Sequence, residues 1–263
     1  MITTYTPAAR AALVVAHPGH ELRVYGWLET TRPRVFVLTD GSGRTELSRL
    51  QSTTNILAGV GAHPGSIYGR FSDLKLYQAL LQHDHEVFTE LVCQLADEFL
   101  RERIEYVVGD AVEGYNTAHD ACRLVLNAAV EMASCARGIK LGNYDFLLKG
   151  RPDDCPARLR ERAVWFHLDD AAVGRKMKAA DNYPELAAEV EAAIRENTAD
   201  AFRVECLRPV EDDAAEQPVA AKPYYEEYAE RQVAAGYYQH VIRYREHILP
   251  LAEALRECIV RAV

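Results

Sequence analysis

The amino-acid sequence predicts an α/β fold, in which helices flank a mostly parallel β-sheet and a helical extension follows at the C-terminus. Through the first two thirds of the chain, short β-branched, apolar segments alternate with longer amphipathic ones. This alternation is typical of parallel strands joined by crossover helices. Gly, Pro or Asp bounds each apolar segment, as expected for strand ends. From residue 170 onward, segments rich in Ala, Glu and Arg dominate, which indicates helices.

The short apolar segments and the longer amphipathic segments predict the strands and helices in chain order. Short apolar segments predict strands at residues 11–16, 34–39, 66–69, 105–109, 144–149 and 163–168. Amphipathic segments between them predict helices at residues 21–30, 45–59, 84–102 and 117–136, and the C-terminal part adds helices at residues 171–178, 184–197 and 224–262. We therefore expect an α/β region over residues 1–168 and a mainly helical extension, residues 169–263, packed on the same domain.

Charge and composition argue against two classes of partner. The 263 residues include 39 acidic and 30 basic side chains, with a formal charge of −9, so we expect binding to neither nucleic acid nor an anionic membrane. No apolar run approaches the roughly 18 residues that cross a bilayer, and no export signal is recognised. The six cysteines form no CxxC pair, which predicts a reduced, cytoplasmic protein.

Three histidines follow predicted strands. His17 ends the first strand, a Pro-Gly pair forms the turn, and His20 begins the next helix. A lone histidine at such a place is more often a hydrogen-bonded structural residue than a ligand. His119, however, opens the helix after another strand, and loops at the carboxyl ends of parallel strands converge. Imidazole nitrogen suits zinc, iron, copper and nickel, so the three histidines predict one metal site.

The motif Ala-His-Pro-x-x-Glu after a strand, a Thr-Asp-Gly turn after the next strand and a histidine that opens a later helix resemble the N-acetylglucosaminylphosphatidylinositol deacetylase family. Its bacterial members are the LmbE-like proteins. The resemblance covers about residues 10–140 and implies a Rossmann-like fold. It also implies a zinc-dependent amidase that removes acyl groups, commonly acetyl, from amino sugars or related small molecules.

The resemblance implies metal ligands at His17, His20 and His119. In the family motif Ala-His-Pro-Asp-Asp-Glu, the first aspartate is the general base and the second binds metal. Gly19 and His20 stand at those two positions here, so the ligand set becomes three imidazoles and the usual base is missing. The expected ion is divalent, Zn²⁺ first, with Fe²⁺ or another transition metal as alternatives. Zinc with an open position lowers the pKa of water to about 7.

Three acids are candidates for the catalytic base, and each has a structural alternative. Glu21 matches the glutamate of the motif, on a first helical turn where it could equally hold a helix end or a neighbour of the metal. Asp110 ends the strand before His119 and could accept a proton from water or orient a ligand histidine. Asp40 lies before Gly in a turn, where Asp commonly accepts local backbone hydrogen bonds.

Three other residues are candidates for binding a small polar substrate. Arg49 roughly matches a family arginine that follows the second strand, and guanidinium suits polar or anionic groups. Tyr115 and Asn116 precede His119 and could hydrogen-bond a carbonyl oxygen as charge develops on it, or could only shape the loop. Asp73 resembles an acidic residue of the family, but a helix N-cap is the simpler interpretation.

Two further clusters have simpler explanations. The segment His83-Asp84-His85-Glu86 resembles a metal cluster in composition, but more simply caps a long solvated helix. Tyrosines gather in the C-terminal region, where packing against the α/β region is expected. They could also cover the mouth of the site or form a homo-oligomer contact. The tyrosines are Tyr224, Tyr225, Tyr228, Tyr237, Tyr238 and Tyr244.

The sequence thus predicts a metal-dependent hydrolase, an N-deacetylase or amidase that acts through metal-activated water on an amino-sugar-like or other N-acyl substrate. The missing general base leaves a second hypothesis open, in which the protein binds metal but performs a different reaction or only binds a ligand. In a third hypothesis the histidines are remnants, and the protein is an interaction or structural module without metal.

Overall fold

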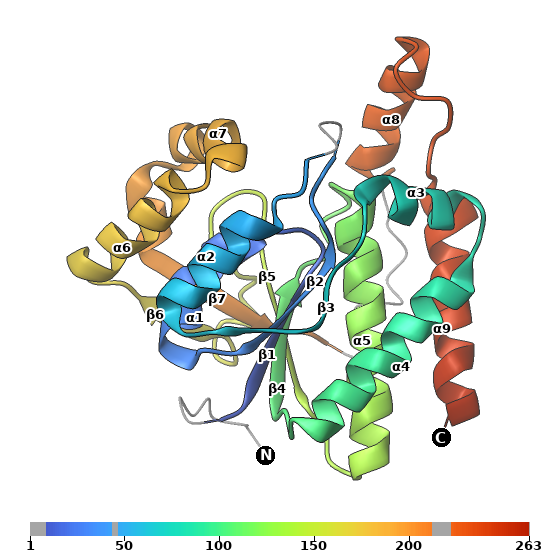
Figure 1. The fold of residues 1–263 in the computed structure, drawn as a ribbon, viewed down its shortest axis with the longest axis horizontal. Coiled ribbons are helices and arrows are strands. Elements are labelled where there is room, and N and C mark those ends of the chain that lie inside the picture. Colours follow the sequence, from blue (N-terminus) through green and yellow to red (C-terminus); the bar gives the residue numbers. More distant parts are fainter. Residues whose placement is uncertain (1–8, 44–46, 212–221, 263) are drawn as a thin grey trace.

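A single seven-stranded sheet organises the chain in the computed structural model, which describes residues 9–43, 47–211 and 222–262. The strand order is β3-β2-β1-β4-β5-β7-β6, and helices cover both faces of the sheet (Figure 1). The pairs from β3 to β5 are all parallel, whereas β7 runs antiparallel to β5 and to β6. The predicted α/β class, with a mostly parallel sheet and helices on both faces, is confirmed.

Each of the six expected strand segments overlaps an observed strand, and one further strand was not predicted. The additional strand, β7, has three consecutive buried residues, Glu205, Cys206 and Leu207, and therefore lacks the alternation that marks a half-buried strand. It lies in the C-terminal part of the chain, where only helices were expected. The strands are β1 (Ala11–Val15), β2 (Arg34–Thr39), β3 (His63–Phe71), β4 (Tyr106–Asp110), β5 (Gly142–Phe146), β6 (Val164–His167) and β7 (Val204–Pro209).

The helices differ from the expected ones in two places. Helix α3 was not predicted, and the single helix expected over residues 224–262 is wrong. That segment forms α8, a connection in which Gly236 has a φ of 78°, a π-helical turn at Tyr244–Ile248, and α9. The helices are α1 (Tyr25–Thr31), α2 (Leu50–Val60), α3 (Asp73–Leu81), α4 (His85–Arg101), α5 (Thr117–Arg137), α6 (Asp170–Asp181), α7 (Ala187–Asn197), α8 (Tyr224–Ala234) and α9 (Leu249–Ala262).

Two further helices begin differently from the expected ones. The helix expected at residues 21–30 starts as a 3-10 turn, His20–Val24, before α1. The helix expected at residues 45–59 begins at Leu50, and residues 45 and 46 lie outside the described part of the chain. None of the described helices combines the length and the apolar composition that crossing a bilayer requires.

Apolar side chains cover both faces of the sheet, and the C-terminal part of the chain contributes to both. On one face, Phe88 of α4 and Val125 of α5 pack with Leu251 of α9. On the other face, Trp27 of α1 packs in a cluster that includes Leu207 of β7. Burial of this apolar area is the main stabilising contribution to the fold. It fixes the carboxyl ends of β1, β2 and β4 at one edge, where the site lies.

Candidate metal centre

Three imidazoles meet at the carboxyl edge of the sheet. His17 follows β1, His20 opens the 3-10 turn after it, and His119 lies in the first turn of α5. The ring centres are 5.3 Å apart for His17 and His20, 5.1 Å for His17 and His119, and 4.6 Å for His20 and His119. The structure therefore brings together the three histidines that the sequence selected, although 99 positions separate His20 from His119.

The turn between the first two histidines leaves no room for a side chain at Gly19. This residue has a φ of 103°, in the region that favours glycine. A Cβ atom there would lie 2.2 Å from Cδ1 of Leu186 and 3.4 Å from the ring of Tyr183. Segments from the C-terminal part of the chain thus fill the space beside Gly19.

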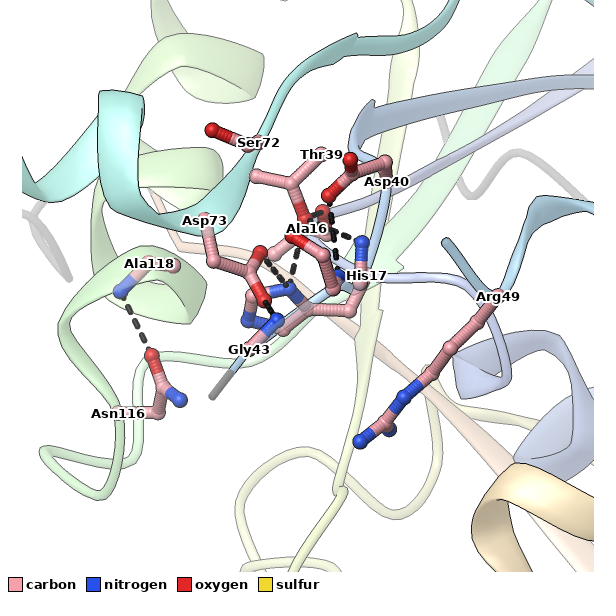
Figure 2. Close-up of polar contacts among 12 residues, drawn as sticks. Ala16, His17, Thr39, Asp40, Gly43, Arg49, Ser72, Asp73, Asn116 and Ala118 are labelled. Atoms are coloured by element: carbon pink, nitrogen blue, oxygen red, sulfur yellow. Dashed lines mark hydrogen bonds and ion pairs between the residues drawn. The ribbon is translucent and has the colours of Figure 1, made fainter. Parts of the chain in front are cut away.

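Two of the imidazoles are oriented through Nδ1. Nδ1 of His17 lies 2.8 Å from Oγ1 of Thr39 and 3.1 Å from Oδ1 of Asp73 (Figure 2). Nδ1 of His20 lies 3.0 Å from both carboxylate oxygens of Asp110. An acceptor at Nδ1 favours the tautomer with its proton there, which leaves the lone pair of Nε2 for a ligand. Carboxylates orient metal-bound histidines in this way.

The third imidazole is buried and neutral. His119 is 7% exposed, and its Nδ1 atom has no hydrogen-bond partner. Burial, followed by the charges of His20, His17 and Lys149, holds the pKa of His119 well below its usual value. Leaving a buried polar atom without a partner costs about 1–3 kcal/mol. A neutral imidazole with an unpartnered nitrogen has the chemistry of a metal ligand.

The donor set fits a transition metal. On a tetrahedral zinc ion with Zn–N distances of about 2.1 Å, imidazole ring centres lie about 5 Å apart, close to the separations observed here. In the described part of the chain, however, no group of His, Cys, Asp or Glu side chains already has the arrangement of a formed metal site. The three histidines therefore fit a transition metal by their chemistry and by the spacing of their rings.

The three candidate bases are engaged in structural hydrogen bonds. Asp110 is fully buried and accepts from the backbone N–H of Ala16 at 2.8 Å as well as contacting His20. Glu21 accepts from the Gly19 N–H and from the Thr53 hydroxyl, both at 2.7 Å, and its complete burial raises its pKa to about 7.

Asp40, the third candidate, accepts from the backbone N–H of Ser42 at 3.0 Å within its turn. Asp40, Glu21 and Asp110 are all absent from the lining of the cavity that contains the three imidazoles. For each of the three acids, the observed hydrogen bonds are those that the structural alternative requires.

One cavity of about 1060 Å³ contains the histidines and the candidate substrate residues. Arg49 lines it, with its guanidinium 3.9 Å from the carboxylate of Glu189 on α7. Tyr115 lines it and stacks on Tyr224 of α8 at 5.1 Å. Asn116 caps α5, since its Oδ1 accepts from the Ala118 N–H at 2.8 Å (Figure 2), which leaves its amide nitrogen as the donor for a ligand.

Asp73 lines the cavity, and the helix N-cap that the sequence favoured for it is wrong. The N-cap of α3 is Ser72, whose hydroxyl accepts from the Lys75 N–H, and Asp73 accepts instead from the Gly43 N–H at 2.6 Å. Burial raises the pKa of Asp73, but hydrogen bonds and the charge of His17 outweigh it and lower the pKa to about 2. The role of Asp73 as a partner of His17 depends on a tertiary contact between the start of α3 and the turn after β1.

Lys149 is a second cavity residue that the sequence did not indicate. Its ammonium lies 4.1 Å from the ring centre of Tyr115. The backbone N–H groups of Leu148 and Lys149 donate to the carboxylate of Glu113, each at 3.0 Å. Arg23 donates to the carbonyl of Leu147 on the same segment at 3.0 Å. The sequence predicted a strand over residues 144–149, but β5 ends at Phe146, so the irregular backbone at Leu148 and Lys149 was not expected.

The fold is similar to that of solved deacetylases. The zinc-inhibited form of teicoplanin deacetylase Orf2 superposes with a TM-score of 0.55 at 15% identity, over 78% of this chain and 100% of that one. The A40926 pseudoaglycone deacetylase Dbv21 gives a TM-score of 0.51 at 19% identity, over 76% and 96%. No family model and no curated protein sequence matches the chain.

Proposed function

We propose that this protein is a metal-dependent hydrolase that removes an acyl group, commonly acetyl, from the nitrogen of a polar, amino-sugar-like substrate. The observation that carries the proposal is the meeting of His17, His20 and His119 in one cavity, with Asp73 and Asp110 at two of the Nδ1 atoms. The fold shared with deacetylases supports the reaction class. Zn²⁺ is the ion we expect, and Fe²⁺ would also suit imidazole ligands.

In this proposal the chain supplies imidazole ligands and the carboxylates that orient two of them. It supplies no carboxylate as the catalytic base. A divalent ion held by His17, His20 and His119 would lower the pKa of water to about 7 and so would supply the nucleophile at neutral pH. Asp73, with its pKa near 2, is a poor proton acceptor at that pH and instead holds His17. Asn116 and Lys149 line the same cavity, and we assign to the amide nitrogen of Asn116 and the ammonium of Lys149 the role of donors to an acyl oxygen as it gains charge.

Gly19 favours a second candidate function, in which the protein binds metal and ligand without hydrolysis. The residue at the position of the family base has no side chain, and the space beside it is filled by Leu186. A protein of this kind would hold one equivalent of metal and bind amino-sugar-like compounds. It would release no acetate from N-acetylated substrates.

Elemental analysis of untagged protein tests the metal centre first. We expect about one equivalent of a transition metal in the wild type and in the control His63→Ala, which changes an exposed histidine of β3. His17→Ala and His119→Ala should lose the bound metal. Both variants should still show a cooperative thermal unfolding transition, which would show that they are folded. Absence of metal in the wild type even after reconstitution, or retention in both site variants, would overturn the proposal.

Acetate release then separates the two candidate functions. A panel of N-acetylated amino sugars is incubated with the metal-loaded wild type and with the metal-free triple variant of His17, His20 and His119. Turnover that needs metal supports the hydrolase. Turnover that survives in the triple variant contradicts it, and bound metal with no turnover on any compound favours the binding protein.

A further inference from the structure

Two cysteines that are distant in the sequence meet on the surface of the fold. All six cysteines are free thiols. Cys93 belongs to α4 and Cys258 to α9, and 165 positions separate them. Their side chains nevertheless lie within hydrogen-bond distance of each other. The fold therefore pairs two thiols that no local motif marks.

The packing of α4 on α9 accounts for this pairing. The two helices lie against each other on one face of the sheet (Figure 1), and Val92 of α4 shares a core cluster with Leu255 and Ile259 of α9. Cys258 lies three residues after Leu255 and directly before Ile259, on the side of α9 that faces the core. Cys93 directly follows Val92. Each cysteine thus lies at the edge of the buried face of its helix.

Edge positions on two packed helices suit a disulfide. The axes of helices in contact lie about 8–10 Å apart, and Cα atoms lie about 2.3 Å from each axis, so Cα atoms on facing sides come within about 3–5 Å. Positions slightly away from the line of closest approach therefore match the Cα separation of about 4.4–6.8 Å that a disulfide spans. Cys93 and Cys258 occupy positions of this kind.

An oxidant in solution can reach this pair of thiols. Cys93 is exposed, and Cys258 is partly exposed. Cys155 and Cys206 also lie within hydrogen-bond distance of each other, but they belong to a separate small core cluster and are only 3% and 2% exposed. Reaction with a dissolved oxidant needs an accessible thiol. The structure therefore favours the pair on α4 and α9.

We propose that Cys93 and Cys258 are a site of reversible disulfide formation that fastens α9 to α4, with a soluble disulfide such as oxidised glutathione as the oxidant. The thiolate of Cys93 attacks one sulfur of the oxidant, whose disulfide bond breaks and releases one thiol. The thiolate of Cys258 then attacks the sulfur of Cys93 and releases the second thiol. The protein loses two electrons to the oxidant, and the protons of its two thiols leave on the two released thiols.

The new bond would restrain the C-terminal part of the chain. It closes a long loop, which limits the freedom of the unfolded chain and stabilises the folded state. Ile242, which lines the cavity, lies shortly before the π-helical turn that leads into α9, so the bond would also anchor the segment behind one cavity wall. The inference goes beyond the proposed function, because neither a metal nor a substrate takes part in the reaction.

Glutathione oxidation of the full-length protein tests this inference. Burial, followed by the neighbouring Cys258 thiol, raises the pKa of Cys93, so the reaction is run at about pH 8.5, where more of the thiol is ionised. Thiols are then counted in denaturant, and a non-reducing peptide map locates the bond. We expect the six thiols to fall to four, with one cross-link between Cys93 and Cys258. The unfolding temperature should rise by about 5 °C or more, and a reductant should reverse the rise.

Three single variants provide the controls. Cys93→Ser and Cys258→Ser should each show neither the cross-link nor the rise in unfolding temperature. Cys135→Ser, which changes an exposed cysteine of α5, should behave like the wild type.

Four results would overturn the inference. The first is six thiols remaining at every ratio of oxidised to reduced glutathione, and the second is a stable mixed disulfide of Cys93 with glutathione in place of the cross-link. The third is a cross-link between other cysteines. The fourth is a cross-link between Cys93 and Cys258 that leaves the unfolding temperature unchanged, since such a bond would not fasten α9 to α4.

Discussion

Asp110 joins the first strand to the histidine turn, because its carboxylate accepts from the backbone N–H of Ala16 at 2.8 Å and lies 3.0 Å from Nδ1 of His20. Ala16 directly follows β1, and Asp110 ends β4, the parallel neighbour of β1. A single buried carboxylate thus fixes both the spacing of two strand ends and the orientation of an imidazole.

Replacing this carboxylate should weaken metal binding. Asp110→Asn keeps an oxygen for the Ala16 N–H but loses the charge that favours the proton on Nδ1 of His20. Loss of such a partner typically reduces metal affinity about 10–100-fold. Chelator competition measures the effect, with Asp40→Asn as a control because the carboxylate of Asp40 accepts from the Ser42 N–H within its own turn. Unchanged affinity in Asp110→Asn would show that His20 is not held as a ligand.

Introducing the aspartate of the family motif at Gly19 should destabilise the protein rather than restore a base. The φ of 103° disfavours any side chain, by about 1–2 kcal/mol, and the overlap of a new Cβ with Leu186 adds to this. Urea unfolding should show a loss of more than about 2 kcal/mol for Gly19→Asp, in the range of strained substitutions.

Two further variants separate the causes of that loss. Gly19→Asp/Leu186→Ala removes the overlapping side chain and should recover part of the stability. Gly59→Asp, where a Cβ meets no neighbour, should be nearly neutral. If Gly19→Asp were as stable as the wild type, the turn would have to adopt another backbone conformation.

The sequence predicted the histidine centre well and the cavity poorly, for a physical reason. His17 and His119 were recognised because an apolar strand followed by a turn is a local pattern, and parallel strands bring such turns together. For the same reason, the orientation of a ligand histidine was one of the two roles that the sequence offered for Asp110. The position of Asp73 beside His17, and of Leu186 beside Gly19, depends on how α3 and the C-terminal segments pack, which no local periodicity encodes.

The stability of the protein should depend on pH through Glu113. Burial, opposed by hydrogen bonds from Lys149 and Leu148, raises the pKa of this carboxyl above its ordinary value of 4.5. The folded state therefore binds the proton more tightly than the unfolded state. The contribution of this group to stability is fully present below pH 4.5 and is lost as the pH rises through the raised pKa.

Glu113→Gln removes this titration. We expect the fall in the free energy of unfolding above pH 4.5 to become shallower in the variant, with an added loss of about 1 kcal/mol at all pH values, because the amide accepts one N–H where the carboxylate accepts two. Urea unfolding at several pH values measures both effects. Parallel pH profiles for the two proteins would show that Glu113 titrates at its ordinary pKa.

A buried carboxylate of β7, paired with Lys176, ties the C-terminal part of the chain to the α/β region. Nζ of Lys176 on α6 lies 2.8 Å from the carboxylate of Glu205 on β7, and that carboxylate also accepts from the backbone N–H groups of Gly26 and Trp27 at the start of α1. Lys176→Met leaves a buried carboxylate without its cation, which should cost about 3–5 kcal/mol.

The double variant Lys176→Met/Glu205→Gln identifies the cause. It removes both charges and keeps an oxygen for the start of α1, so it should be more stable than Lys176→Met alone, since an uncompensated buried charge costs more than a neutral pair. Thermal unfolding gives the comparison. If the double variant were less stable than the single one, the carboxylate of Glu205 would stabilise α1 through its charge rather than through the ion pair. The connection between β7 and α1 would then not depend on Lys176.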